Sequence, residues 1–221
     1  MTISSNIQTK TLAKICGLTR AQDVACAIEF GASFLGFIVE AASKRQLTVT
    51  KAARLARPAK DIAATVAVTV NADDALLTLI MAEMAPDYIQ CHGDESLQRV
   101  AQIARNFNVK TIKACPIASD EDMKSAGEYS GAADLILFDA KPPAGSNVRG
   151  GHGIAIDWDI IARAPTPKSY LLAGGLTPDN VAAAIAATGA PIVDVSSGVE
   201  ASAGVKDASK IKAFMKAVKH G

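Results

Sequence analysis

No sign of charge dominates this chain, and no apolar run in it is long enough to cross a membrane. Its 221 residues carry 23 Lys and Arg against 22 Asp and Glu, a net charge of +1. Proteins that bind nucleic acid or a membrane surface gather many basic residues on one face, so we expect neither partner. The longest uncharged stretch, residues 180–193, has 14 residues, whereas a membrane span needs about 18 or more. An anionic ligand must therefore be held by local groups.

Cysteine is also scarce, and the N-terminus carries no targeting pattern. Four cysteines are too few for a disulfide framework, and they lack the close pairing of a zinc site, so we expect free thiols. Residues 1–10 have neither the basic start nor the apolar block of a secretory signal, which favours a cytoplasmic protein. The cysteines are Cys16, Cys26, Cys91 and Cys115.

Short β-branched and apolar runs alternate with segments of helical composition along the whole chain. The runs begin near residues 11, 33, 63, 87, 109, 134, 169 and 191, and helical spacing marks segments such as 20–30, 73–84, 96–106, 178–187 and 207–219. Such alternation is typical of a parallel sheet, and eight units predict a single (β/α)₈ barrel (TIM barrel) domain over residues 1–221. The alternative is an open doubly wound sheet, which would usually carry a glycine-rich dinucleotide loop after its first strand.

The only long connection covers about residues 140–156, and no low-complexity linker divides the chain. A connection of that length inside a compact barrel is more often an active-site element than a linker, so we expect it to move over the site.

Side chains that close the strands are the candidates for chemistry, because barrel active sites lie at the carboxyl ends of the strands. Side chains in a strand alternate between its two faces. Cys16 therefore shares a face with Lys14 on the first strand, and Asp139 shares one with Leu135 and Leu137 on the sixth. If these faces point inward, Cys16 and Asp139 both reach the pocket as a base and an acid. The alternatives are that Cys16 only packs, and that Asp139 pairs with Lys141 or caps a helix.

The same alternation selects further polar residues at other strand ends. It groups Gln90 with His92 on the fourth strand, and Asp194 with Ser196 on the eighth. The fifth strand offers Lys113 and Cys115 on one face, while Cys91 faces the helices. The simpler interpretations are that His92 is a hydrogen-bonded turn residue and that Asp194 orients a loop.

Two glycine-containing loops predict a phosphate site. The seventh strand leads into Gly174 and Gly175, and the eighth leads into Ser196, Ser197 and Gly198. Glycines let backbone N–H groups approach an anion closely, and a following helix N-terminus adds its dipole. The loops after strands 7 and 8 are the recurrent phosphate site of this barrel class.

With these residues in view, the chain resembles the phosphoribosylanthranilate isomerase family of tryptophan biosynthesis. The resemblance runs nearly end to end through five segments that follow strands 1, 4, 6, 7 and 8 in the family's order. They are residues 14–19 (KICGLT), 90–95 (QCHGDE), 138–143 (FDAKPP), 173–178 (AGGLTP) and 194–200 (DVSSGVE).

The resemblance implies an Amadori rearrangement of N-(5'-phosphoribosyl)anthranilate, an aminoaldose, to an aminoketose. Asp139 would be the general acid that opens the ribose ring, and Cys16 the general base that takes the C2 proton. Arg45 would lie near the anthranilate carboxylate, and Gln90, His92 and Asp194 would contact the substrate. The resemblance implies neither a metal nor an organic cofactor, and it leaves the oligomeric state open between monomer and homodimer.

Three rival functions fit part of the pattern. An indole-glycerol-phosphate synthase would carry an extra segment before the first strand, and a ribulose-phosphate epimerase would need more metal-binding histidines than the three present. A non-catalytic barrel that binds a phosphorylated metabolite would have no need of both Cys16 and Asp139.

Overall fold

Eight parallel strands close into a barrel in the structure, a computed structural model that describes residues 10–39, 41–141 and 157–221. Each strand pairs with the next along the chain, and the first pairs with both the second and the last, which closes the ring. The barrel strands are β1 (Leu12–Ile15), β2 (Phe34–Val39), β4 (Ala64–Thr69), β5 (Tyr88–Cys91), β6 (Lys110–Ile117), β7 (Leu135–Ala140), β8 (Tyr170–Leu172) and β9 (Ile192–Val195). The predicted (β/α)₈ barrel is therefore confirmed, and the open sheet is excluded.

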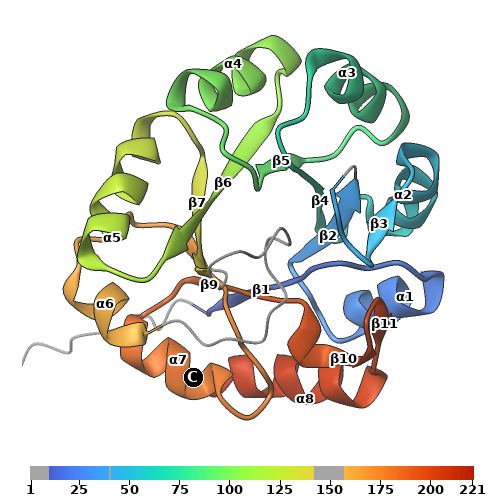
Figure 1. Cartoon of the computed structure of the whole chain (residues 1–221). Helices are drawn as coiled ribbons and strands as arrows, with labels where there is room; N and C mark the ends of the chain where they lie inside the picture. The colour runs from blue at the N-terminus through green and yellow to red at the C-terminus, as the bar shows by residue number, and fades with distance from the viewer. Residues whose placement is uncertain (1–9, 40, 142–156) are drawn as a thin grey trace, which may run out of the picture.

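The helices form a ring outside the strands (Figure 1). Five of them lie in the segments chosen from helical spacing, and α2, α5 and α6 are additional short helices. The helices are α1 (Ala21–Glu29), α2 (Val49–Ala56), α3 (Asp74–Glu83), α4 (Leu97–Phe107), α5 (Asp120–Gly127), α6 (Trp158–Arg163), α7 (Val181–Thr188) and α8 (Ala208–Val218). In the described part of the chain, none of them is long and apolar enough to cross a membrane.

The structure also contains smaller elements outside the eight barrel strands. A two-residue strand, β3 (Gln46–Leu47), pairs with β2, and a hairpin of β10 (Glu200–Ser202) and β11 (Val205–Lys206) follows β9. Three 3-10 turns complete the elements: η1 (Arg57–Ala59), η2 (Glu128–Gly131) and η3 (Ser197–Val199). The connection at residues 142–156 lies outside the described residues, so its expected movement stays a prediction.

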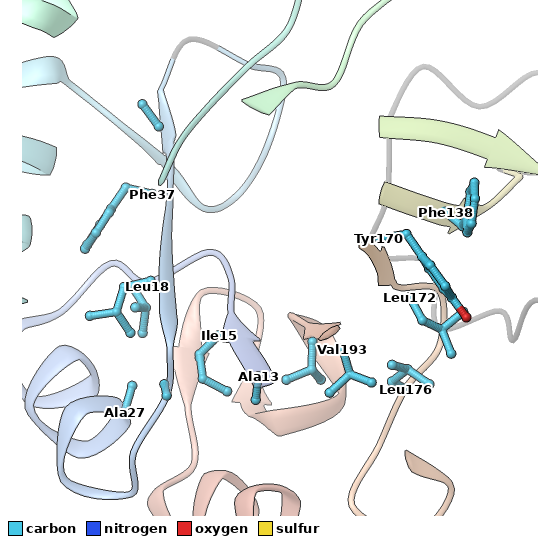
Figure 2. Close-up of a cluster of buried hydrophobic side chains, with 14 of the residues drawn as sticks. Ala13, Ile15, Leu18, Ala27, Phe37, Phe138, Tyr170, Leu172, Leu176 and Val193 are labelled. Atoms are coloured by element: carbon cyan, nitrogen blue, oxygen red, sulfur yellow. The ribbon is translucent and has the colours of Figure 1, made fainter. Parts of the chain in front are cut away.

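The buried side chains form two layers, as period-two alternation requires. One cluster takes residues from the strands and their ends and none from a helix, so it fills the barrel; it includes Cys16, Leu135 and Leu137. The other cluster combines strand residues such as Ile15 and Phe138 with helix residues, so it lies between the strands and the helices. Part of this outer layer is drawn in Figure 2. The inward orientation predicted for β1 and β7 is confirmed.

The fifth predicted strand, β6, shows where alternation alone is insufficient. Lys113 and Cys115 do share a face, but Cys115 packs in the outer layer. The Lys113 ammonium is buried there and lies 2.8 Å from the Glu95 carboxylate. Lys113 therefore does not line the barrel interior.

The two-layer core predicts how the chain responds to truncation of a leucine. Leu137 is fully buried inside the barrel, so Leu137→Ala should lower the free energy of unfolding by about 2–5 kcal/mol, through lost burial and the cavity left behind. Leu79→Ala makes the same change at a side chain that is 45% exposed, and should stay within about 0.5 kcal/mol of wild type. Chemical denaturation measures both, and equal effects would contradict this assignment of the core.

Candidate active site

Four strand ends bring the predicted acid, base and substrate-contacting residues to one mouth of the barrel. Cys16 follows β1, Gln90 and His92 stand at the end of β5, Asp139 lies in β7, and Asp194 lies in β9. All eight barrel strands run parallel, so their carboxyl ends share this mouth. The structure therefore gathers residues that are distant in sequence.

A buried ion pair lies beneath Cys16. The Lys14 ammonium donates to Asp194 Oδ1 at 2.9 Å, and the Lys14 side chain is fully buried. Burial alone would lower the pKa of Lys14, but the negative charge of Asp194 raises it above its ordinary value. Lys14 therefore stays cationic, which is the positive charge that a thiolate at Cys16 would need.

The surroundings of Cys16 favour its neutral thiol form over the thiolate. Burial raises the pKa of Cys16, and the positive charge of Lys14 offsets this only in part, because the nearby Asp194 carboxylate raises the pKa further. The thiolate form therefore has to be generated when it is needed.

Within the described residues, Asp139 has one polar contact at each carboxyl oxygen. Its Oδ1 accepts a hydrogen bond from its neighbour's backbone, Ala140 N, at 2.9 Å. Its Oδ2 lies 3.5 Å from His92 Nε2, and the Asp139 side chain is 15% exposed. The alternative partner, Lys141, instead pairs with Asp122 at 3.1 Å. Asp139 is thus not held in an ion pair with Lys141 and keeps a face toward the mouth.

Gln90 in β5 and His92, the residue directly after β5, have side chains in contact, as the alternation predicts. Gln90 Nε2 lies 2.8 Å from His92 Nδ1. Among the described residues, Gln90 Oε1 is buried without a hydrogen-bond partner. The two side chains therefore form a short series that ends at Asp139.

The backbone that carries His92 is anchored from the outer layer. The Lys113 ammonium donates to the carbonyl oxygen of Gly93 at 2.6 Å and to Glu95 at 2.8 Å. Glu95 in turn accepts from the Gly93 backbone N–H at 2.9 Å and from that of Asn71 at 2.8 Å. Because these groups are buried and paired, the turn after β5 has little freedom to move.

The loops after β8 and β9 pack against each other, as predicted for a phosphate site. A side chain at Gly198 would collide with the carbonyl oxygen of Leu176, so the two loops can approach this closely only with glycine there. Gly174 and Gly175 both have positive φ, 83° and 67°. No described residue accepts a hydrogen bond from either of their backbone N–H groups, which leaves both donors available to an anion.

Arg45 reaches the same region but is held by a carboxylate. Its Nε and Nη2 donate to the two oxygens of Glu200, both at 2.7 Å. The Lys206 ammonium donates to Glu200 at 2.9 Å and to the backbone oxygen of Ser196 at 2.9 Å. Burial would raise the pKa of Glu200, but these two cations hold it below its usual range. The sequence interpretation placed Arg45 near the site and did not include Glu200 or Lys206.

The sequence held a weak indication of a site role for Glu200 and none for Lys206. Glu200 closes the segment 194–200, and a charged residue at the end of a glycine-containing loop could have been taken as an anchor. Lys206 lies in a short hairpin with no pattern of its own, so its burial depends on the folded chain.

Comparisons with known proteins point to one family. The family model of N-(5'-phosphoribosyl)anthranilate (PRA) isomerase matches residues 13–217. A relative from Brucella canis named N-(5'-phosphoribosyl)anthranilate isomerase is 44% identical over 205 residues, 93% of this chain and 92% of the relative.

Solved structures show the same fold. Phosphoribosyl anthranilate isomerase from Thermotoga maritima is 32% identical with a TM-score of 0.83, over 95% of this chain and 98% of that one. A complex of such an isomerase with reduced 1-(o-carboxyphenylamino)-1-deoxyribulose 5-phosphate is 31% identical with a TM-score of 0.81, at the same coverage. The chain therefore belongs to the N-(5'-phosphoribosyl)anthranilate isomerase family.

Proposed function

We propose that this isomerase converts N-(5'-phosphoribosyl)anthranilate to 1-(2-carboxyphenylamino)-1-deoxyribulose 5-phosphate by general acid and general base catalysis. The observation that carries the proposal is the placement of a carboxyl and a thiol, Asp139 and Cys16, at one barrel mouth. Beside them lie Gly174 and Gly175, whose backbone N–H groups donate to no described residue. The relatives that bear this name support the substrate.

Asp139 is the general acid in the first step. Its carboxyl proton passes to the ring oxygen of the ribose, the bond between that oxygen and C1 breaks, and the nitrogen lone pair forms the Schiff base. Asp139 is left as a carboxylate. Its place on β7, with one oxygen held by Ala140 N, directs the other oxygen toward the mouth.

Cys16 is the general base in the second step. Cys16 first releases its thiol proton to solvent, and the resulting thiolate takes the C2 proton. The electron pair of that C–H bond forms a C1–C2 double bond, and the Schiff-base π electrons return to nitrogen. The enolamine then loses its C2 hydroxyl proton and gains one at C1. Lys14 stabilises the thiolate, while Asp194 keeps the Lys14 ammonium in place.

Phosphate and anthranilate bind at different groups around the mouth. The backbone N–H groups of Gly174 and Gly175 bind the phosphate together with the loop of Ser196, Ser197 and Gly198. Arg45 attracts the anthranilate carboxylate with the N–H groups that Glu200 does not use. Asp194 acts through Lys14, and Gln90 and His92 complete the wall on β5.

Replacing the acid and the base tests the proposed roles. Asp139→Asn and Cys16→Ser should each lower kcat at least 100-fold while KM changes little, because each removes a proton-transfer group and leaves the binding groups intact. Steady-state conversion of phosphoribosylanthranilate by the purified protein, without added metal, is the measurement. Near-normal turnover in either variant removes that residue from the mechanism, and a wild-type rate no faster than the uncatalysed reaction rejects the proposed function.

The resting protonation state of Cys16 gives an independent test. Because burial raises the pKa of Cys16, its thiolate should appear only as the pH rises above the ordinary thiol value of about 8.5. The far-ultraviolet thiolate absorbance of wild type minus that of Cys16→Ser, followed from pH 6 to pH 10, measures this transition. Cys26→Ser controls for the loss of a cysteine outside the barrel. A midpoint below pH 8 for Cys16 would show that the resting group is already a thiolate.

A further inference from the structure

The polar series on β5 has an unusual feature, a buried amide oxygen with no partner. Gln90 is fully buried, and within the described residues its Oε1 accepts no hydrogen bond. An unpaired buried acceptor destabilises the folded chain, so its presence needs a compensating interaction. The other end of the same amide, Nε2, lies 2.8 Å from His92 Nδ1.

This amide orientation decides which nitrogen of His92 carries the proton. Gln90 Nε2 can only donate a hydrogen bond, so His92 Nδ1 must accept it. The tautomer of His92 that fits this contact carries its proton on Nε2. In the flipped orientation of the amide, Gln90 Oε1 would accept from a proton on His92 Nδ1, and His92 Nε2 would then carry no proton. The unpaired oxygen is therefore the cost of keeping a donor on Nε2.

The donor on Nε2 faces the proposed acid. His92 Nε2 lies 3.5 Å from Asp139 Oδ2, which is longer than a good hydrogen bond. The His92 and Asp139 side chains are 18% and 15% exposed, so the contact is largely shielded from solvent. At this distance the donor can still move closer to Oδ2.

We propose that His92 is a positioning residue whose Nε2–H stabilises the negative charge that develops on Asp139 as the proton leaves, and that Gln90 holds His92 in the required tautomer. The inference rests on the proposed function, in which Asp139 is the general acid. No proton leaves His92: its N–H only shortens its contact with Oδ2.

The hydrogen bond from His92 to Asp139 stabilises the transition state more than the ground state. A hydrogen bond from N–H to a carboxylate is about 2.7–2.9 Å long and roughly twice as strong as a neutral one. Closing the 3.5 Å contact as the charge appears therefore favours ring opening over substrate binding. The anchored turn at Gly93, held by Lys113 and Glu95, keeps His92 in reach of Asp139.

Substitutions at His92 test the role of the Nε2 donor. His92→Leu removes the donor and should lower kcat about 10- to 100-fold, the size of one hydrogen bond to a charged group, with KM within about twofold of wild type. His92→Gln keeps an N–H near the position of Nε2 and should recover most of the loss. His220→Leu makes the same change at an exposed histidine and should leave the kinetics unchanged.

A double-mutant cycle shows whether His92 acts through Asp139. In the Asp139→Asn background, His92→Leu should cost less than about twofold, because no carboxylate charge then develops. Thermal unfolding of each variant confirms that the barrel is intact, and binding of the reduced product analogue checks the site.

The outcomes separate this inference from the proposed function. An inactive Asp139→Asn with a fully active His92→Leu overturns the role of His92 alone, whereas an active Asp139→Asn removes Asp139 from the proposed mechanism and the inference falls with it. A rise in KM without a fall in kcat would make His92 a direct substrate contact. Independent, additive losses in the double variant would also overturn the inference.

Discussion

A buried ion pair across the closing strands is the interaction on which the site depends. Lys14 and Asp194 are register partners on β1 and β9, the first and last strands of the barrel. Removing either would leave an uncompensated charge in the barrel interior, which is far more costly than losing an exposed pair. The pair thus joins the closure of the fold to the electrostatics of the thiol directly above it.

The other charged side chains at the mouth are also paired, but some pairs are closer than others. Glu200 is shared by Arg45 and Lys206, so its charge is well compensated and the guanidinium is fixed in orientation. Asp139 and His92 make the loosest of these contacts, at 3.5 Å. Catalysis by a general acid needs such a difference, because a group that must give up a proton cannot already be committed to a strong ion pair.

Under the proposed function, a nearly neutral protein holds an anionic substrate by local groups. The net charge is +1, but the guanidinium of Arg45 and the N–H groups of Gly174 and Gly175, which donate to no described residue, lie around one mouth. Backbone dipoles in a shielded site attract a phosphate strongly without an excess of Lys and Arg over the surface. The small net charge is therefore compatible with phosphate binding.

Strand positions, alternation and the glycine loops could be predicted from the sequence because each depends on residues close together in the chain. Cys16 and Asp139 point inward for that reason, and the same rule groups Gln90 with His92. The local pattern could not decide that Lys113 faces the helices, since its charge is buried only because Glu95 arrives from another loop.

The pairings that tune the site were decided by the tertiary structure alone. Lys14 and Asp194 are 180 residues apart, and Arg45 and Glu200 are 155 apart. Barrel closure and strand register determine the partner of each charged side chain, because two side chains form an ion pair only when the backbone places them within reach of each other. The sequence by itself determined the barrel, its inner faces and the chemical groups at its mouth, while the closed sheet decided their partners, their burial and hence their protonation.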